Sequence, residues 1–457
     1  MIHQYTMFGL NIVLDVYSGA VHAVSDAVYE ILLYLADETE LPDTIPANVL
    51  NILSERYTKD ELIEAYGEIY ELHKQGLLLT DDEYKDLALN LPKKSVVKAL
   101  CLHIAHDCNL RCSYCFADTG SFKGKRSLMS FETGKKAIDF VIENSEHRRN
   151  IEIDFFGGEP LINFKVVKQI TEYAKEQGKL HDKNFRFTIT TNGLLLNDEI
   201  NDYINENMSN VVLSLDGRPQ INDRVRRRVD GTGSYDTIVP KFKKLVESRG
   251  TKDYYIRGTF TANNLDFAQD VMHIVGLGFK QTSMEPVVVP DTEYYAILPE
   301  HLNRIYSEYE RLAQIYIEKR QSGEPFNFFH FMIDLDQGPC VIKRLSGCGA
   351  GHEYLAITPD GDIYPCHQFV GDKNFYMGNV FDKTFDLSIK EKFEKSNVYT
   401  KPSCQDCFAK FYCSGGCCAN AYHFNNDINK PYEMACAMER KRVECAIAIA
   451  AKLKLDE

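Results

Sequence analysis

The sequence predicts an α/β fold, in which a partial barrel of six strand–helix units follows a small N-terminal module and precedes a cysteine-rich C-terminal domain. Short apolar runs alternate with amphipathic helical segments between about residues 96 and 321, a pattern typical of parallel α/β architectures. A chain of 457 residues is long enough for about two or three domains. Ten of its 14 cysteines lie between residues 340 and 445, which sets the C-terminal part apart from the rest.

The first 90 residues are expected to form the N-terminal module. Apolar residues alternate from Asn11 to Val24 around Ser18-Gly19, which predicts a hairpin. Helical patterns follow at 25–37, 47–55 and 59–75, and a short strand-like run ends the unit at 77–79. A hairpin, three helices and a short wing are the parts of a winged helix-turn-helix.

The last of these helices argues against DNA as its partner. It carries five acidic residues against two lysines: Asp60, Glu61, Glu64, Glu68 and Glu71 against Lys59 and Lys74. A phosphate backbone would repel such a helix, and the whole chain has a formal net charge of −14. We therefore expect no nucleic-acid partner.

Six barrel strands are expected, at 97–105, 151–156, 185–191, 211–216, 254–261 and 279–285. Helices are expected at 131–145, 164–178, 197–206, 235–248 and 265–276. In such folds chemistry gathers at the C-terminal ends of the strands. The expected domains are 1–90 for the module, 96–321 for the barrel, 322–347 for a connecting segment, 348–440 for the cysteine-rich domain and 441–457 for a C-terminal helix.

Composition indicates where the protein works. With 44% hydrophobic and 26% charged residues, the chain is typical of soluble globular proteins. No apolar run approaches the roughly 18 to 20 residues of a membrane span, and the N-terminus lacks the pattern of a secretory signal. Clustered cysteines in a reducing compartment indicate metal or redox chemistry rather than disulfides. We expect a cytoplasmic protein without a membrane partner.

Three cysteines follow the first barrel strand with the spacing CxxxCxxC: Cys108, Cys112 and Cys115. Thiolates at this spacing can ligate three of the four irons of a [4Fe–4S] cluster and leave the fourth iron for an external ligand. A structural zinc site would need four ligands, usually in two pairs. Three unconnected thiols or a zinc site are the alternatives.

With this loop and the Gly-Gly turn after the second strand, residues 96 to about 290 resemble the radical S-adenosylmethionine superfamily. The resemblance implies that the open iron binds the amino and carboxylate groups of S-adenosylmethionine. Reduction of the cluster would then cleave this cofactor to methionine and a 5′-deoxyadenosyl radical. The protein would supply orientation and exclude side reactions, because the cofactor does the difficult chemistry.

The same resemblance implies contacts to S-adenosylmethionine. Gly157-Gly158-Glu159 matches the family's GGEP segment, which accepts hydrogen bonds from an ammonium group, although a Gly-Gly pair after a strand is also common in plain turns. Arg226 resembles the arginine that pairs with the methionyl carboxylate. The full expected set, with Tyr114 along the adenine and Ser214 on the ribose or carboxylate, is Tyr114, Gly157, Gly158, Glu159, Asn192, Ser214 and Arg226.

Seven later cysteines follow the pattern C-x12-G-x4-C, gap, C-x2-C-x5-C-x3-C, gap, C. They are Cys348, Cys366, Cys404, Cys407, Cys413, Cys417 and Cys436. The pattern resembles the SPASM domain, an extension of radical enzymes that modify peptides, and a pair of zinc knuckles is the alternative. Its glycine, Gly361, lies in Thr358-Pro-Asp-Gly-Asp, which predicts a hairpin turn.

The SPASM resemblance implies two auxiliary [4Fe–4S] clusters, and so three clusters in all. Cys404, Cys407, Cys413 and Cys436 would hold one of them. Cys348, Cys366 and Cys417 would hold the other, and either Cys340 supplies its fourth ligand or one iron stays open for substrate. The remaining cysteines, Cys101, Cys418 and Cys445, are interpreted as buried small hydrophobic residues.

Anaerobic sulfatase maturases also resemble this chain, with one difference. They carry an acidic residue, interpreted as the general base, directly after the cysteine equivalent to Cys366, where this chain has His367. Formylglycine formation is therefore disfavoured, although histidine can also act as a base.

The order of module, barrel and SPASM domain resembles thioether-forming peptide maturases, in particular those of the cysteine-rich SCIFF peptides. There the module recognises a ribosomally made precursor peptide, whose leader adds as a strand to a sheet edge. The implied enzyme joins a substrate cysteine sulfur to a carbon of an acceptor residue. It would take electrons from a low-potential donor such as flavodoxin or ferredoxin. The alternatives are another radical peptide modification (a carbon–carbon crosslink or an oxidation) and a zinc-bound peptide-binding adaptor without catalysis.

Overall fold

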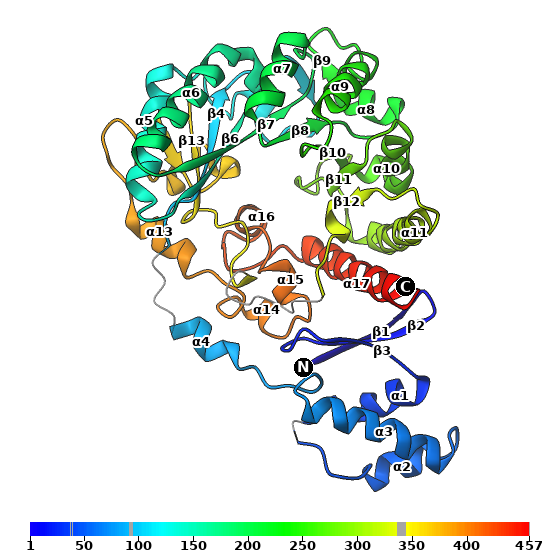
Figure 1. Ribbon diagram of the computed structural model, residues 1–457. Helices are drawn as coiled ribbons and strands as arrows, with labels where there is room; N and C mark the ends of the chain where they lie inside the picture. Colours follow the sequence, from blue (N-terminus) through cyan, green and yellow to red (C-terminus); the bar gives the residue numbers. More distant parts are fainter. Residues whose placement is uncertain (37, 39, 91–94, 336–343, 457) are drawn as a thin grey trace.

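The computed structural model describes residues 1–36, 38, 40–90, 95–335 and 344–456 (Figure 1). At its centre lies a ten-stranded sheet with the order β12-β11-β10-β8-β7-β6-β4-β13-β14-β15. The sheet is open, because its two ends are different edge strands that do not pair with each other. In Figure 1 it curves as an arch with helices along its outer side.

The six predicted barrel strands are confirmed, and each pairs in parallel with its barrel neighbours. They are β4 (Ala99–Ala105), β6 (Asn150–Gly157), β7 (Asn184–Thr191), β8 (Asn210–Ser214), β10 (Tyr255–Phe260) and β11 (Gln281–Pro286). In β6, Ile151, Ile153 and Phe155 alternate with less buried residues and are fully buried in the main core. β6 is thus a strand whose apolar face packs into the core and whose other face carries polar residues.

The five predicted barrel helices are also confirmed. They are α5 (Phe131–Asn144), α6 (Phe164–Leu180), α7 (Asp198–Asn207), α9 (Tyr235–Arg249) and α10 (Phe267–Gly276). Side-chain oxygens of Ser130 and Asn197 cap α5 and α7, which fixes where these helices begin. A short helix α8 (Pro219–Val225), the long helix α11 (Leu302–Gln321) and strand β12 (Asn327–Phe328) complete this part of the chain.

The cysteine-rich domain begins by extending the barrel sheet. β13 (Tyr354–Ile357) pairs in parallel with β4, and β14 (Asp362–Tyr364) and β15 (Gly378–Asn379) follow it in antiparallel pairing. The predicted turn between β13 and β14 is confirmed, with Gly361 at φ +88°. The pairing of β13 with β4 therefore joins the barrel and the cysteine-rich domain in one sheet.

Helices form the rest of that domain. They are α13 (Leu387–Glu394), α14 (Pro402–Gln405), α15 (Lys410–Cys413), α16 (Cys418–Asn425) and α17 (Glu433–Leu455). The last helix begins at Glu433, so the boundary expected at residue 441 lies inside it and Cys436 stands in its first turn.

The N-terminal module is a three-stranded antiparallel sheet with four helices. Its elements are β1 (Ile2–Met7), β2 (Leu10–Asp15), β3 (Val21–Val24), α1 (Asp26–Leu35), α2 (Ala47–Leu53), α3 (Lys59–Lys74) and α4 (Tyr84–Asn90). The predicted hairpin and three helices are confirmed, but β1 was not predicted. The strand expected at 77–79 is wrong: this segment is a turn that buries Leu78 and Leu79 in the module core, with Leu79 at φ +53°.

The module packs against the cysteine-rich domain through a ring stack and hydrogen bonds. The ring of His3 stacks on Phe408 with centroids 3.5 Å apart, and Tyr5 donates a hydrogen bond of 2.9 Å to the carbonyl of Glu444. Asp82 accepts from the hydroxyl of Tyr399 at 2.8 Å. Figure 1 accordingly places the module beside α17, at the opposite end of the molecule from the barrel helices.

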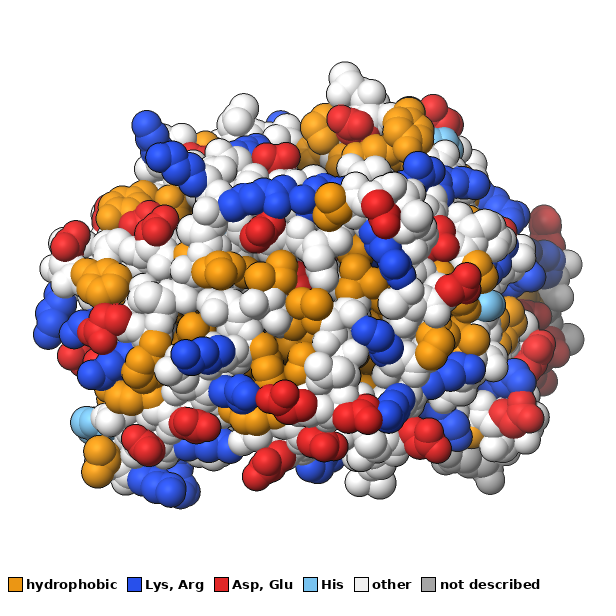
Figure 2. All heavy atoms as spheres, turned by 90° about the horizontal axis from the view of Figure 1, so that it is seen from above, with side chains coloured by type: hydrophobic (Ala, Val, Ile, Leu, Met, Phe, Trp, Pro, Cys, Tyr) orange, Lys and Arg blue, Asp and Glu red, His pale blue; other side chains and the backbone are white. Residues whose placement is uncertain are grey.

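The helix-covered face of the barrel, seen from above in Figure 2, carries acidic and basic side chains side by side. Among the described residues, no helix is both long enough and apolar enough to cross a membrane.

Candidate functional site

The loop with the first three cysteines lies where the chain leaves β4. A short strand in this loop, β5 (Leu110–Cys112), pairs antiparallel with β9 (Arg226–Arg228), and in this register Cys112 faces Arg226. The backbone N–H of Leu110 donates to the sulfur of Cys108 at 3.4 Å, and the side-chain amide of Asn192 lies 3.6 Å from the same sulfur. These donors favour a thiolate at Cys108.

The charges around this loop agree with a multi-iron centre. Burial raises the pKa of Cys108 to about 11 and of Cys112 to about 12, and Arg226 is the main group that lowers the pKa of Cys112. The thiols of Cys108 and Cys115 both raise the pKa of Cys112, so the three side chains lie near one another. Over the described part of the chain no three His, Cys, Asp or Glu side chains converge as ligands of one metal ion. Three thiol donors near one another suit an iron–sulfur cluster, whose irons take thiolate ligands.

The Gly-Gly turn after β6 packs directly on this loop. A Cβ at Gly157 would lie 2.4 Å from the carbonyl oxygen of Ala105, and one at Gly158 would lie 2.2 Å from that of Asp107. Gly157 also has φ +122°, a conformation that side chains rarely adopt. Both glycines are thus required by the close approach of two backbones beside Cys108.

Glu159 connects this turn to the end of β7. Its carboxylate accepts hydrogen bonds from Thr191 Oγ1 at 2.8 Å, from the N–H of Asn192 at 2.8 Å and from the N–H of Leu161 at 3.1 Å. The side chain is 1% exposed, and burial raises its pKa to about 7 despite these donors. In this arrangement the carboxylate holds the Asn192 loop, and Asn192 in turn donates to Asn109 at 2.8 Å.

Asp216, for which no role was predicted, lies at the centre of a buried triad with Tyr114 and Arg226. The hydroxyl of Tyr114 donates to its Oδ2 at 2.6 Å, and Nε of Arg226 lies 2.9 Å from the same oxygen. The Arg226 guanidinium also lies 5.5 Å from the centre of the Tyr114 ring. Asp216 thus orients both expected cofactor contacts.

The expected contact Ser214 is the last residue of β8 and is partly buried. In the pairing of β8 with β10, Ser214 faces Arg257.

Three histidines lie near this loop. Nδ1 of His103 is 3.0 Å from Nε2 of His106, and His367 packs against the rings of Phe116 and Phe156 with centroids 5.3 and 5.1 Å away. Burial lowers the pKa of His106 and of His367 to about 4. His367 is therefore neutral at pH 7, and its burial disfavours the protonated form.

The cysteine-rich domain brings its cysteines into two groups. In the first group, burial raises the pKa of the Cys366 thiol, and the nearby thiols of Cys348 and Cys417 raise it further. In the second group, the pKa of Cys413 is raised to about 12. Burial is the main cause, and the nearby thiols of Cys404, Cys407 and Cys436 add to it. This division agrees with the two ligand sets implied by the resemblance. Cys340 lies outside the described residues.

The three remaining cysteines differ from one another. Cys101 and Cys445 are 1% and 0% exposed, as expected for small hydrophobic residues. Cys418 is only partly buried, lies close enough to act on Cys348 and Cys417, and has the Lys401 ammonium 3.9 Å from its sulfur. Its interpretation as a buried hydrophobic residue is therefore wrong.

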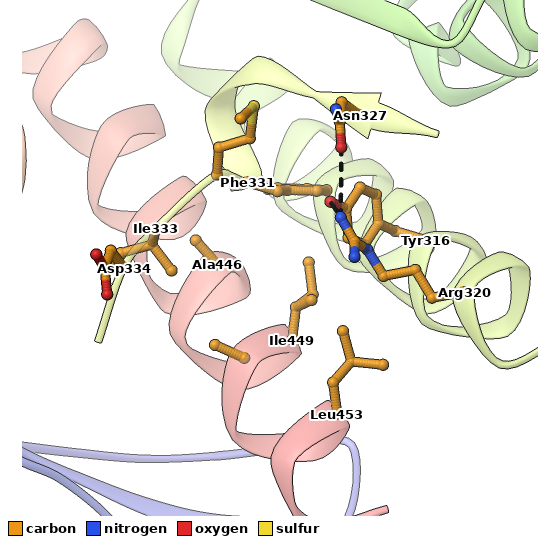
Figure 3. Close-up of a pocket in the computed structure, with 11 residues that line it drawn as sticks. Tyr316, Arg320, Asn327, Phe331, Ile333, Asp334, Ala446, Ile449 and Leu453 are labelled. Carbon is orange, nitrogen blue, oxygen red and sulfur yellow. Dashed lines mark hydrogen bonds between the residues drawn. The ribbon is translucent and has the colours of Figure 1, made fainter. Parts of the chain in front are cut away.

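A pocket lies between α11, α17 and residues 327–334 (Figure 3). Its volume is about 440 Å³, and Arg320 reaches across it to Asn327 at 3.3 Å. Among its described lining residues there is no cysteine or histidine, so it does not belong to the cluster sites.

Comparison with known families identifies two parts of the chain. Residues 102–259 match the radical SAM superfamily, and residues 348–408 match the iron–sulfur cluster-binding SPASM domain. The radical SAM cyclopropyl synthase TigE of Paramaledivibacter caminithermalis is 24% identical over 87% of this chain and 84% of its own length. The cysteine-type anaerobic sulfatase-maturating enzyme of Clostridium novyi is 25% identical over 71% of this chain and 88% of its own.

Two solved structures share the fold. Native anSMEcpe with bound AdoMet superposes with a TM-score of 0.64 over 78% of this chain and 98% of its own, at 20% identity. Streptococcus suis SuiB bound to S-adenosylmethionine superposes with a TM-score of 0.53 over 94% of this chain and 96% of its own, at 16% identity.

Proposed function

The chain is a radical S-adenosylmethionine protein of the SPASM-containing maturase type, and from that premise we propose that it forms an intramolecular thioether in a cysteine-rich precursor peptide. The observation that carries this proposal is the arrangement of three cysteine groups. One lies at the end of β4 beside the Asp216 triad, and the other two lie in a domain whose strand β13 pairs with β4. A radical site and two auxiliary sites thus share one sheet.

The radical SAM and SPASM domains imply S-adenosylmethionine and [4Fe–4S] clusters as cofactors. Cys108, Cys112 and Cys115 would hold the cluster that binds S-adenosylmethionine. Together, the cluster and S-adenosylmethionine would supply a radical able to remove a carbon-bound hydrogen. The terminal nitrogens of Arg226 would bind the methionyl carboxylate as a planar fork. Tyr114, held by Asp216, would lie along the adenine, and Asn192 and Ser214 would complete the cofactor contacts.

The proposed reaction removes two hydrogens from the peptide. One carbon-bound hydrogen passes to the 5′-deoxyadenosyl group, and the substrate thiol loses its hydrogen as a proton while the sulfur–carbon bond forms. The surplus electron passes to one of the two auxiliary clusters. This is either the cluster on Cys348, Cys366 and Cys417 or the cluster on the second cysteine group. The thiol proton leaves to a base, and His367, which directly follows Cys366, is the candidate for that base.

The N-terminal module would bind the leader of the precursor peptide. Support comes from its open three-stranded sheet, whose edges are β1 and β3, and from the solved structure of SuiB bound to its precursor peptide SuiA. Beside the end of β3 lies a groove of about 360 Å³ between α1 and α3. Four of its lining residues are acidic (Asp26, Glu61, Glu64 and Glu68), which favours a leader with basic residues.

A second function has a specific observation in its favour. TigE, which matches most of this chain, is named a cyclopropyl synthase, and such a product joins carbon to carbon. Both products lose two hydrogens, so mass alone does not separate them. A thioether consumes one free thiol, whereas a carbon–carbon product leaves every thiol open to alkylation.

The test is anaerobic turnover of the reconstituted enzyme with a cysteine-rich peptide encoded beside its gene. We expect deoxyadenosine formation and a product two hydrogens lighter that takes up one alkyl group fewer than the substrate. The Cys112→Ala variant should form no deoxyadenosine yet retain iron at the auxiliary sites. Undiminished deoxyadenosine from this variant would refute the radical site, and full alkylation of the product would refute the thioether.

A further inference from the structure

Two lysines of the cysteine-rich domain are buried to 2% exposure, Lys401 and Lys410. Lys410 has the partners that a buried cation needs. Its ammonium lies 3.6 Å from Asp82, donates to the carbonyl of Gln405 at 3.0 Å and sits 4.6 Å from the centre of the Tyr17 ring. Its charge is thus balanced by the protein.

Lys401 is different. Its ammonium donates to the carbonyl of Gly415 at 2.7 Å and lies 3.9 Å from the sulfur of Cys418. Neither of these two partners is a carboxylate. A buried ammonium without a nearby anion is costly, so a negative group is required close to this side chain.

The position of Lys401 indicates what that group is. Gly415 lies in the short loop between Cys413 and Cys417, which belong to different cysteine groups. The backbone carbonyl of Lys401 itself accepts from the N–H of Cys404 at 2.9 Å. Cys418, whose sulfur lies 3.9 Å from the ammonium, directly follows Cys417 of the other group, so Lys401 lies beside members of both groups.

We propose that Lys401 is a counter-cation shared by the two auxiliary cluster sites, a fixed positive charge that makes both clusters easier to reduce. This inference rests on the proposed assignment of the two cysteine groups as cluster ligands. A cluster held by thiolates carries net negative charge and gains one more negative charge on reduction, so a cation nearby stabilises the reduced state more than the oxidised state. In the proposed reaction, the same charge favours transfer of the surplus electron from the substrate.

The test separates this charge from mere packing. Lys401→Met keeps the length of the side chain and removes the charge, and Lys401→Arg keeps the charge. Lys395→Met removes a lysine that is 77% exposed in the same domain and serves as the matched control. All variants are made in full-length protein that also carries Cys112→Ala, so that only auxiliary clusters titrate.

Iron and sulfide content come first, followed by redox titration monitored by electron paramagnetic resonance. We expect Lys401→Met to hold as much iron as its parent and to lower the auxiliary midpoint potentials by about tenfold in the reduction equilibrium, or about 59 mV for one electron. Lys401→Arg and Lys395→Met should stay close to the parent. Loss of iron in Lys401→Met that Lys401→Arg restores would also support the proposal.

Two results would overturn the inference while the clusters stand: unchanged potentials in fully loaded Lys401→Met, or equal iron loss in Lys401→Met and Lys401→Arg. A Cys112→Ala parent without auxiliary iron would overturn the cluster assignment itself, and the inference with it.

Discussion

Asp216 is a single buried carboxylate on which three distant segments converge. Besides Tyr114 and Arg226, it accepts a hydrogen bond of 2.9 Å from the backbone of Thr259 on β10. Tyr114 belongs to the cysteine loop and Arg226 to β9, so this one side chain ties the cysteine loop to two other parts of the sheet. Its role is positioning, because the groups that would touch the cofactor are Tyr114 and Arg226.

We predict that Asp216→Asn weakens binding of S-adenosylmethionine without removing iron. The amide cannot balance the Arg226 charge, and breaking a buried pair costs about 3 kcal/mol of folding free energy. Isothermal titration of the reconstituted variant should show a dissociation constant raised about tenfold or more. Asp230→Asn, a change at an exposed aspartate that accepts only from Thr232, is the control. Equal affinity in both variants would contradict the positioning role.

The sequence revealed the cysteines of this site but not Asp216, for a physical reason. Cys108, Cys112 and Cys115 lie within one short loop, so they leave a local spacing that can be read directly. The triad joins residues 114, 216 and 226, and a contact across 102 residues leaves no local pattern. Only Ser214-Leu-Asp216-Gly at the end of a predicted strand pointed to the region.

Among the elements, α3 has the most specific proposed function. Its apolar residues Leu62, Ala65, Tyr66 and Ile69 are buried in the module, and Thr58 and Glu61 cap its start reciprocally. The opposite side of the helix leaves Glu64 and Glu68 exposed along the groove next to α1. Charge on this helix therefore acts on a ligand rather than on the fold.

We predict that the Glu64→Lys, Glu68→Lys double variant binds the precursor peptide about tenfold more weakly, because reversed charges at the groove repel a basic leader. Fluorescence anisotropy with a labelled leader peptide measures the loss. Glu71→Lys, exposed on the same helix but not lining the groove, should bind normally. Uncoupled cleavage of S-adenosylmethionine should be unchanged in all three proteins. Equal weakening by Glu71→Lys would show that net charge, not the groove, determines affinity.

The elements that could be predicted are those whose pattern is local. The apolar runs of the six barrel strands are bounded by turns or capped helices, so each was found within a few residues. β1 and the pairing of β13 with β4 could not be predicted, because pairing between distant segments leaves no periodicity. The run at 77–79 misled for a related reason: Leu78 and Leu79 are buried by a tight turn rather than by strand pairing.

At the scale of the whole molecule, the N-terminal module is part of the support of the cysteine-rich domain. Asp82 accepts from Tyr399 and forms the ion pair with buried Lys410, and Lys410 stands three residues before Cys413. Removing residues 1–90 would leave this lysine without its anion and without the Tyr17 ring. Truncation would therefore disturb the cysteine-rich domain as well as peptide binding.

We predict that Asp82→Asn destabilises the folded protein by about 2 kcal/mol, since it leaves the Lys410 charge buried while Asp82 itself is partly exposed. Chemical unfolding of the reconstituted protein measures the change. Asp81→Asn alters the exposed neighbouring residue and should change stability little. If the two variants lose equal stability, the ion pair does not stabilise the contact between the module and the cysteine-rich domain.

The parallel pairing of β13 with β4 has a consequence for the order in which the protein is made. The two strands are separated by about 250 residues, since Ala99 pairs with Tyr354. At a translation rate of about 5 to 20 residues per second, β4 leaves the ribosome roughly 12 to 50 seconds before its second neighbour exists. During that interval one edge of β4 is unpaired, a template for wrong strand pairing next to the cysteine loop. Nascent chains are therefore most vulnerable to aggregation before residue 357 emerges, and the sheet reaches its full set of strands only when the last domain is synthesised.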